Sequence, residues 1–348
     1  MKIQSIGGHD YKLPDVQSTF EREMYVHLIQ WKWVHVSKDA GHNKHKGRMI
    51  PYDAILPDDC KREEKIPHLH PSVWGHLVAH RSRNPFRIHP HFYHMASSQA
   101  ANINLFLPIL HSSAASTILC AIKNDFKELA TDQLDHGYCL EYWGRNFEKV
   151  PSGKGLLGDK SARAGTDADI AIAYRNHQDE LCLWLIEHKL VEQEFTACGG
   201  FKSKGRTNSH NCTRSFSQML TDPSACYYHD KCQYRYWNIT KANEAFFVNH
   251  AKHPQCPFQG GMNQLWRNQL LALATEQQGN FYKHAHFSVV RHPENKALET
   301  SLVAYQDLIA NNSKFSTFTS AAVIQASEQH ADSGLREWIS WYKELYYL

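Results

Sequence analysis

The chain has 348 residues, of which 42% are hydrophobic and 21% are charged, and its formal net charge is +3 at pH 7. This composition excludes an intrinsically disordered chain, while so small a net charge does not identify a partner. No stretch approaches 18 apolar residues and the N-terminus has no apolar signal-peptide core, so we expect a cytoplasmic protein without a membrane span. The nine cysteines are then expected to be reduced or metal-bound.

The first 90 residues predict an extension with little regular structure. Residues 15–36 read as a helix that runs into an aromatic stretch. Residues 37–90 are rich in His, Pro and basic residues, a composition that favours loops and short elements. We therefore divide the chain into an irregular His- and Pro-rich N-terminal extension, residues 1–90, and a core, residues 91–348.

The core alternates helical and strand patterns, which predicts an α/β fold. Helices are expected at 95–111 and 115–132. The alternating "ADIAIAY" and the continuously apolar "LCLWLIEHKL" flank the polar "RNHQDE", which is typical of a hairpin within a buried sheet. Downstream we expect a helix at 261–278, a strand and turn in "HFSVVRHPENK", and an amphipathic helix at 333–348.

Glu187 and Lys189 lie two positions apart near the end of the apolar strand, so their side chains point to the same face. A charged pair there costs free energy unless it is matched or used. If Tyr174 and Leu181 flank the turn, Asp169 lies opposite Ile186, next to Glu187. Two carboxylates repel each other and a divalent cation removes the repulsion, with Mg²⁺ or Mn²⁺ suited to hard oxygen ligands. An ion pair at a strand edge is the alternative interpretation.

The order Asp169, then Glu187-His188-Lys189, resembles the signature of the PD-(D/E)XK nuclease superfamily. The stretches "SSQAANINLFLPIL", "GTDADIAIAY", "QLWRNQLLALA" and "VVRHPENK" are similar to one bacterial family of this superfamily, which has an SSQA helix. The resemblance covers roughly residues 90–310. It implies a restriction-endonuclease-like mixed central sheet flanked by helices. It also implies Asp169 and Glu187 as ligands of Mg²⁺ or Mn²⁺ and Lys189 as the residue that positions the attacking water.

Three further residues are candidates for the same site. Asp167 stands where the family has Ser, so either Asp can be the ligand, and the position relative to Thr166 favours Asp169. Superfamily members often add an upstream acid and a downstream Gln, which points to Glu141 and Gln264 here. An ordinary surface position is the alternative for Glu141. Ser97, Ser98 and Gln99 are expected to cap and pack a helix, with a role at the site as the alternative.

The Cys-rich, basic segment 196–260 forms an insertion in the core. Its cysteines 198, 212, 226 and 232 suggest a structural Zn²⁺, with an iron–sulfur cluster less favoured and free buried thiols as the alternative. A Gly-containing loop in this segment can bind phosphates; a solvated loop is the alternative. The residues concerned are Cys198, Cys212, Cys226, Cys232, Lys202, Lys204, Arg206 and Arg214.

The sequence therefore predicts a metal-dependent endonuclease that acts on nucleic acid, with DNA favoured over RNA. Roles in restriction, phage defence or mobile-element biology are all compatible with it. The alternative is a nucleic-acid-binding protein with an inactive nuclease core and a Cys-rich lobe held by a metal. The oligomeric state stays open, with a homodimer as one option.

Overall fold

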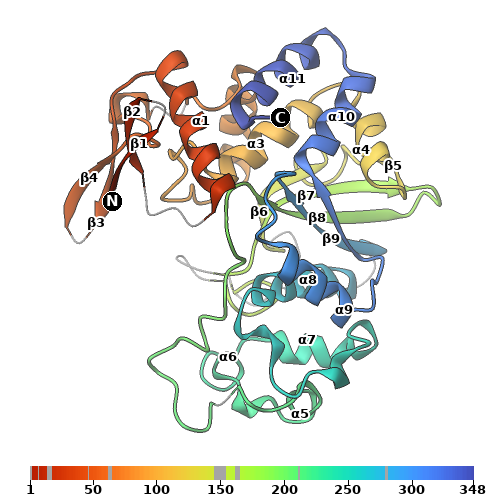
Figure 1. The fold of residues 1–348 in the computed structure, drawn as a ribbon. Coiled ribbons are helices and arrows are strands. Elements are labelled where there is room, and N and C mark those ends of the chain that lie inside the picture. Colours follow the sequence, from red (N-terminus) through yellow and green to blue (C-terminus); the bar gives the residue numbers. More distant parts are fainter. Residues whose placement is uncertain are drawn as a thin grey trace.

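The computed structural model describes residues 2–6, 8–13, 18–45, 47–61, 65–144, 154–160, 165–210, 212–278 and 281–348. At its centre lies a six-stranded mixed sheet of order β10-β9-β8-β7-β5, with β6 also paired to β7 (Figure 1). None of the helices in these ranges combines the length and the hydropathy that a membrane span requires. The strands are β5 (Phe126–Leu129), β6 (Tyr138–Tyr142), β7 (Ala168–Asn176), β8 (Leu181–Lys189), β9 (His284–Arg291) and β10 (Phe315–Thr319).

The strands β7 and β8 form the predicted antiparallel hairpin, one residue out of the predicted register. Tyr174 lies opposite Cys182 rather than Leu181. The side chain of Asn176 explains the shift, because its Oδ1 accepts hydrogen bonds from the amides of Gln178 and Glu180 and so closes the turn one residue later.

The corrected register matters for the charged end of the hairpin. Ile170 pairs with Ile186, so the register places Asp169 opposite Glu187. Residues directly opposite each other in a sheet share a face. The two carboxylates are therefore direct cross-strand neighbours rather than diagonal ones.

Helices cover both faces of the sheet and make two hydrophobic cores. The face that carries Ile170, Ile172 and Ile186 packs under α3 (Ser98–Leu110), α4 (Ala115–Ile122), α10 (Ser320–His330) and α11 (Ser333–Tyr346). The opposite face, with Ala171 and Leu185, packs under α8 (Met262–Gln277), α9 (Glu299–Leu308) and the Cys-rich lobe (Figure 1). The lobe contains the short helices α5 (Phe216–Thr221), α6 (Tyr227–Asp230) and α7 (Tyr236–Ala242).

The helix expected at 115–132 is wrong in its second half. It ends at Ile122, and the chain turns into the edge strand β5. Asp125 binds both Lys123 and the Tyr174 hydroxyl, at 2.6 and 2.7 Å, and Phe126 stacks on the Tyr174 ring. Tertiary contacts with β7 therefore override the local helical pattern.

Residues before 90 are more regular than expected. They contain β1 (Lys2–Ile6), β2 (His9–Leu13), α1 (Thr19–His35), β3 (Gly41–His45), β4 (Arg48–Tyr52) and α2 (Trp74–Arg83). The described residues of the basic sequence "GHNKHKGR" include all of β3 and the first residue of β4, Arg48. Buried side chains of α1 and α2, including Leu28 and Leu77, belong to the same core as α3 and α11. The domain boundary at residue 90 stays a prediction.

A buried polar contact joins α2 to the turn before β6. Asp135 is 8% exposed and accepts hydrogen bonds from His80 Nδ1, at 2.7 Å, and from Arg83. Nε2 of His80 accepts the Leu140 amide at 3.2 Å, so this ring is the neutral Nδ1–H tautomer. Burial opposes ionisation of Asp135, but the donors outweigh it and hold its pKa below the ordinary 3.8.

We expect Asp135→Asn to lower the free energy of unfolding by about 1–3 kcal/mol at pH 7, because the charged partner of Arg83 is lost. The difference from wild type should shrink as the pH falls toward 3, since a depressed carboxyl pKa contributes stability that disappears in acid. Urea unfolding at several pH values measures both effects. The control is Asp132→Asn, at a side chain that is 59% exposed. An equal loss in both variants would contradict the prediction.

Candidate active site

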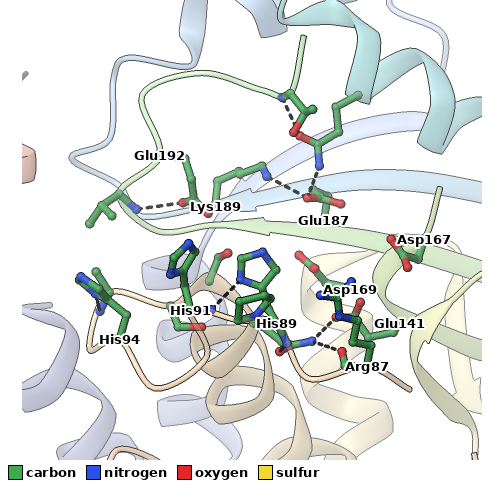
Figure 2. Close-up of a pocket in the computed structure, with 18 of the residues that line it drawn as sticks. Arg87, His89, His91, His94, Glu141, Asp167, Asp169, Glu187, Lys189 and Glu192 are labelled. Carbon is green, nitrogen blue, oxygen red and sulfur yellow. Dashed lines mark hydrogen bonds and ion pairs between the residues drawn. The ribbon is translucent and has the colours of Figure 1, made fainter. Parts of the chain in front are cut away.

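A cleft of about 1180 Å³ opens where β6, β7 and β8 carry their charged residues. Its walls come from three parts of the chain: the N-terminal region, the sheet with the segment that follows β8, and α8. Figure 2 shows the side chains of the strands facing a segment that carries Arg87 and three histidines. Residues before 90 therefore form part of this cleft, a role that the sequence did not suggest.

Three carboxylates project into the cleft from adjacent strands. Asp169 on β7 lies between Glu187 on β8 and Glu141 on β6. β6 pairs with β7 on both sides of Glu141, whose own φ is 51°, in the left-handed region that non-glycine residues rarely adopt. This local distortion occurs at the residue that adds a third carboxylate to the cleft.

Burial and mutual repulsion raise the pKa values of two of these carboxyl groups. Burial, and then the charges of Glu187 and Glu141, raise the pKa of Asp169 well above its ordinary value. Burial and the charge of Asp167 raise the pKa of Glu141 to about 8. Perturbed carboxyl pKa values of this kind mark candidate functional sites.

Lys189 is the cation closest to this group. Its ammonium lies 2.9 Å from Glu187 Oε1, and both residues are less than 8% exposed. Burial alone would lower the pKa of Lys189, but the carboxylates of Glu187, Glu192 and Asp169 raise it above its ordinary value. Lys189 is therefore a fixed positive charge at neutral pH.

Amide donors orient the carboxylates from both sides of the sheet. Gln264 and Asn268, one turn apart on α8, donate to the two oxygens of Glu187 at 2.6 and 2.8 Å. Gln99, near the start of α3, donates to Glu141 at 2.7 Å, while Ser97 caps that helix. The backbone amide of His188 donates to Asp169 at 2.6 Å, whereas the imidazole of His188 points into the opposite core and is fully buried.

The structure brings five of the six residues predicted for this site together, and the sixth is paired with a lysine. Asp169, Glu187, Lys189, Glu141 and Gln264 are brought together. Asp167 also lines the cleft, but its carboxylate forms an ion pair with Lys160 at 2.8 Å.

Sequence reasoning missed several polar residues of this cleft. Asn268 could have been found from its i+4 spacing to Gln264. Arg87, His89 and His91 lie on the opposite wall (Figure 2), and only the high content of histidine gave a general hint. Burial lowers the pKa of His89, so its ring is neutral at pH 7.

The donor set of the cleft fits a hard divalent cation. Seven Asp and Glu residues line it, against three Lys and Arg residues. Nucleic-acid phosphates would be repelled by such a surface unless a cation reduced its negative charge. Carboxylate oxygens are the ligands that Mg²⁺ and Mn²⁺ prefer. Among the residues that the structure describes, no group of three or more His, Cys, Asp or Glu side chains is arranged as a metal-binding site.

The basic residues in the loop after β8 are of two kinds, exposed lysines and arginines that are bonded within the lobe. Lys202 and Lys204 are exposed. The guanidinium of Arg206 donates to the carbonyls of Phe201 and His210, and Arg214 pairs with Asp222 at 2.6 Å. The two arginines are therefore engaged within the lobe, and the two lysines are the loop residues best placed to contact phosphate.

The cysteines are also arranged differently from the predicted set. Cys198, Cys212 and Cys226 line one small cavity, and the fourth cysteine at this cavity is Cys256. Cys232 is not among the described residues that line it. Sequence spacing favoured Cys232, because it is nearer along the chain, whereas Cys256 reaches the cavity from the segment before α8.

Comparison with known proteins agrees with this geometry. No curated protein and no solved structure shows significant similarity to the chain. Residues 36–347 match the family described as "Restriction Endonuclease associating with ARP", which covers most of both the N-terminal region and the core. The restriction-endonuclease-like fold suggested by the sequence resemblance is thereby confirmed. The chain belongs to this restriction endonuclease family and is a nuclease of that type.

Proposed function

We propose that this nuclease is a Mg²⁺-dependent endonuclease that hydrolyses phosphodiester bonds in DNA. The observation that carries the proposal is the row of Glu141, Asp169 and Glu187 across three strands, with Lys189 held on Glu187 at 2.9 Å. Carboxylates on neighbouring strands repel one another when ionised, and a bound divalent cation removes that repulsion. A purely structural ion pair would need Glu187 and Lys189 alone.

Asp169 and Glu187 are the residues that would hold the cation, with Glu141 as a third ligand. A divalent cation supplies Lewis-acid stabilisation of the charge that develops on the phosphate and on the leaving oxygen. The amides of Gln264 and Asn268 keep the Glu187 carboxylate in one orientation. Because both helices that supply amide donors pack on the sheet, the acidic row is rigid before substrate binds.

Lys189 acts as a charged donor rather than as a base, because its neighbours raise its pKa. An ammonium in this position orients the attacking water and stabilises the negative charge of the transition state. It also offsets part of the repulsion between the acidic row and an approaching phosphate.

The opposite wall is suited to the nucleic-acid backbone. Arg87, His89 and His91 line this wall as polar groups that a nucleic-acid backbone could contact. Among the described residues of the cleft, none is placed to recognise a 2′-hydroxyl, so the choice of DNA as substrate depends on the restriction-endonuclease family. On the same basis we propose a role in restriction or phage defence, and association with ARP as in the family description.

The first test compares Lys189→Ala and Glu187→Gln with wild type on plasmid, linear and single-stranded DNA and on RNA. Both variants should lose about 10²- to 10⁴-fold in cleavage rate, because one charged donor or one ligand is removed, while DNA binding stays largely intact. The measurement is cleavage with Mg²⁺ or with EDTA, alongside binding by fluorescence anisotropy in Ca²⁺.

The matched control is Glu194→Gln, an exposed carboxylate in the same cleft, which should cleave at nearly the wild-type rate. Wild-type cleavage by Lys189→Ala would refute the mechanism. Binding without cleavage by the wild-type protein would instead favour an inactive nuclease core. Preferential cleavage of RNA would overturn the choice of substrate.

A second prediction concerns the loop after β8. Changing Lys202 and Lys204 to Gln should weaken DNA binding and reduce its salt dependence by a slope of about one per lysine, with no change in the rate at saturating DNA. Salt titrations of binding measure this effect. Lys241→Gln, at an exposed lysine of α7 in the same lobe, is the control. Unchanged salt dependence in the double variant would show that the loop does not contact DNA.

A third prediction concerns pH and metal. A carboxyl with a raised pKa stabilises the fold when protonated, so this contribution is complete below the ordinary 4.5 and is lost as the pH rises through about 8. In EDTA, the stability of the wild type should therefore decline from pH 6 to about 9 more steeply than that of Glu141→Gln. Mg²⁺ should raise the melting temperature of wild type most at high pH. Parallel curves for the two proteins would contradict this.

A further inference from the structure

Four cysteines from separate segments meet inside the Cys-rich lobe. Cys198 follows β8, Cys212 lies in the next loop, Cys226 precedes α6, and Cys256 precedes α8. All four line a single cavity of about 20 Å³, which is enclosed by the side chains of Phe258, Trp237 and Trp266. These aromatic residues are at most 2% exposed, whereas Cys198 is buried and the other three cysteines are partly exposed.

Backbone hydrogen bonds fix the cysteine segments against each other. The Cys198 amide donates to the Gln259 carbonyl at 3.1 Å, and the Cys256 amide donates to the Cys212 carbonyl at 3.3 Å. The Gln259 side chain donates to the carbonyls of Cys212 and Cys256. Three segments that are far apart in sequence therefore converge through contacts that do not involve sulfur.

A backbone amide contacts one of the four sulfurs. The amide of Phe201 donates to Cys198 Sγ at 3.4 Å. An amide donor favours the thiolate, whereas burial raises the pKa of all four thiols, so a bound cation would be needed to hold them as thiolates.

Two nearby residues do not belong to the group. His210 also lines the cavity, but its Nε2 binds Asp230 at 2.9 Å and its Nδ1 accepts the Thr207 amide. Both ring nitrogens are thus occupied. Cys232 is described by the structure but does not line the cavity.

We propose that Cys198, Cys212, Cys226 and Cys256 form a structural tetrathiolate site for one Zn²⁺. The cavity volume suits a single ion rather than a multi-atom cluster, since about 10–15 Å³ accommodates one water-sized sphere. Four thiolates in a closed site are a typical ligand set of structural Zn²⁺. The ion would join four loop segments of a lobe whose helices are only four to seven residues long. This inference does not depend on the proposed nuclease activity.

The test uses the full-length protein expressed with zinc and purified without chelator. Metal analysis should find about one zinc and no iron per chain. Cys198→Ser and Cys256→Ser should each lose most of the zinc, while the matched variant Cys232→Ser, in the same lobe, should retain it. Protein reconstituted with Co²⁺ should show the intense near-ultraviolet charge-transfer absorption of a tetrathiolate.

Wild-type protein provides a second measurement if the serine variants fail to fold. Removing zinc with a strong chelator should make four additional thiols reactive and lower the melting temperature. Absence of bound zinc, iron in its place, or equal dependence on Cys232 and Cys256 would each overturn the proposal. Thiols that are equally reactive before and after chelation would also overturn it and leave the cysteines as buried apolar side chains.

Discussion

The structure depends on holding three carboxylates together on one face of a sheet. Glu141, Asp169 and Glu187 come from adjacent strands, and their mutual repulsion and burial raise the pKa values of Asp169 and Glu141. Such an arrangement costs free energy in the absence of a cation. The rest of the fold provides the compensation. Lys189 supplies a positive charge, and α3 and α8 supply amide donors from either side.

The strand that carries Asp169, β7, is paired on both sides. It lies between β8 on one side and both β5 and β6 on the other, so its whole length is hydrogen bonded. A strand fixed in this way keeps Asp169 from moving away from its neighbours. Asp169 lies near one end of β7, whereas the apolar residues along the rest of the strand pack into both cores.

The sequence was informative where the relevant pattern is local. The spacing of Glu187 and Lys189 on a strand places them on one face whatever the tertiary structure, and the motif around them indicated the family. The register was one residue off because the Asn176 side chain decides where the turn closes. The position of Glu141 depends on a distorted backbone at φ 51°, which no local pattern predicts. The contribution of residues before 90 to the cleft is equally non-local.

The Cys-rich lobe occupies the connection between two elements of the site. Because β8 and β9 are parallel, the chain must cross from one end of the sheet to the other, and this crossover contains the lobe and then α8. β8 delivers Glu187 and Lys189, whereas α8 delivers Gln264 and Asn268 to the same carboxylate. The lobe also packs on α8 through Trp266 and Phe258, whose rings stack at 4.0 Å. We therefore expect loosening of the lobe to shift the amide donors away from Glu187, because α8 contacts both the lobe and this carboxylate.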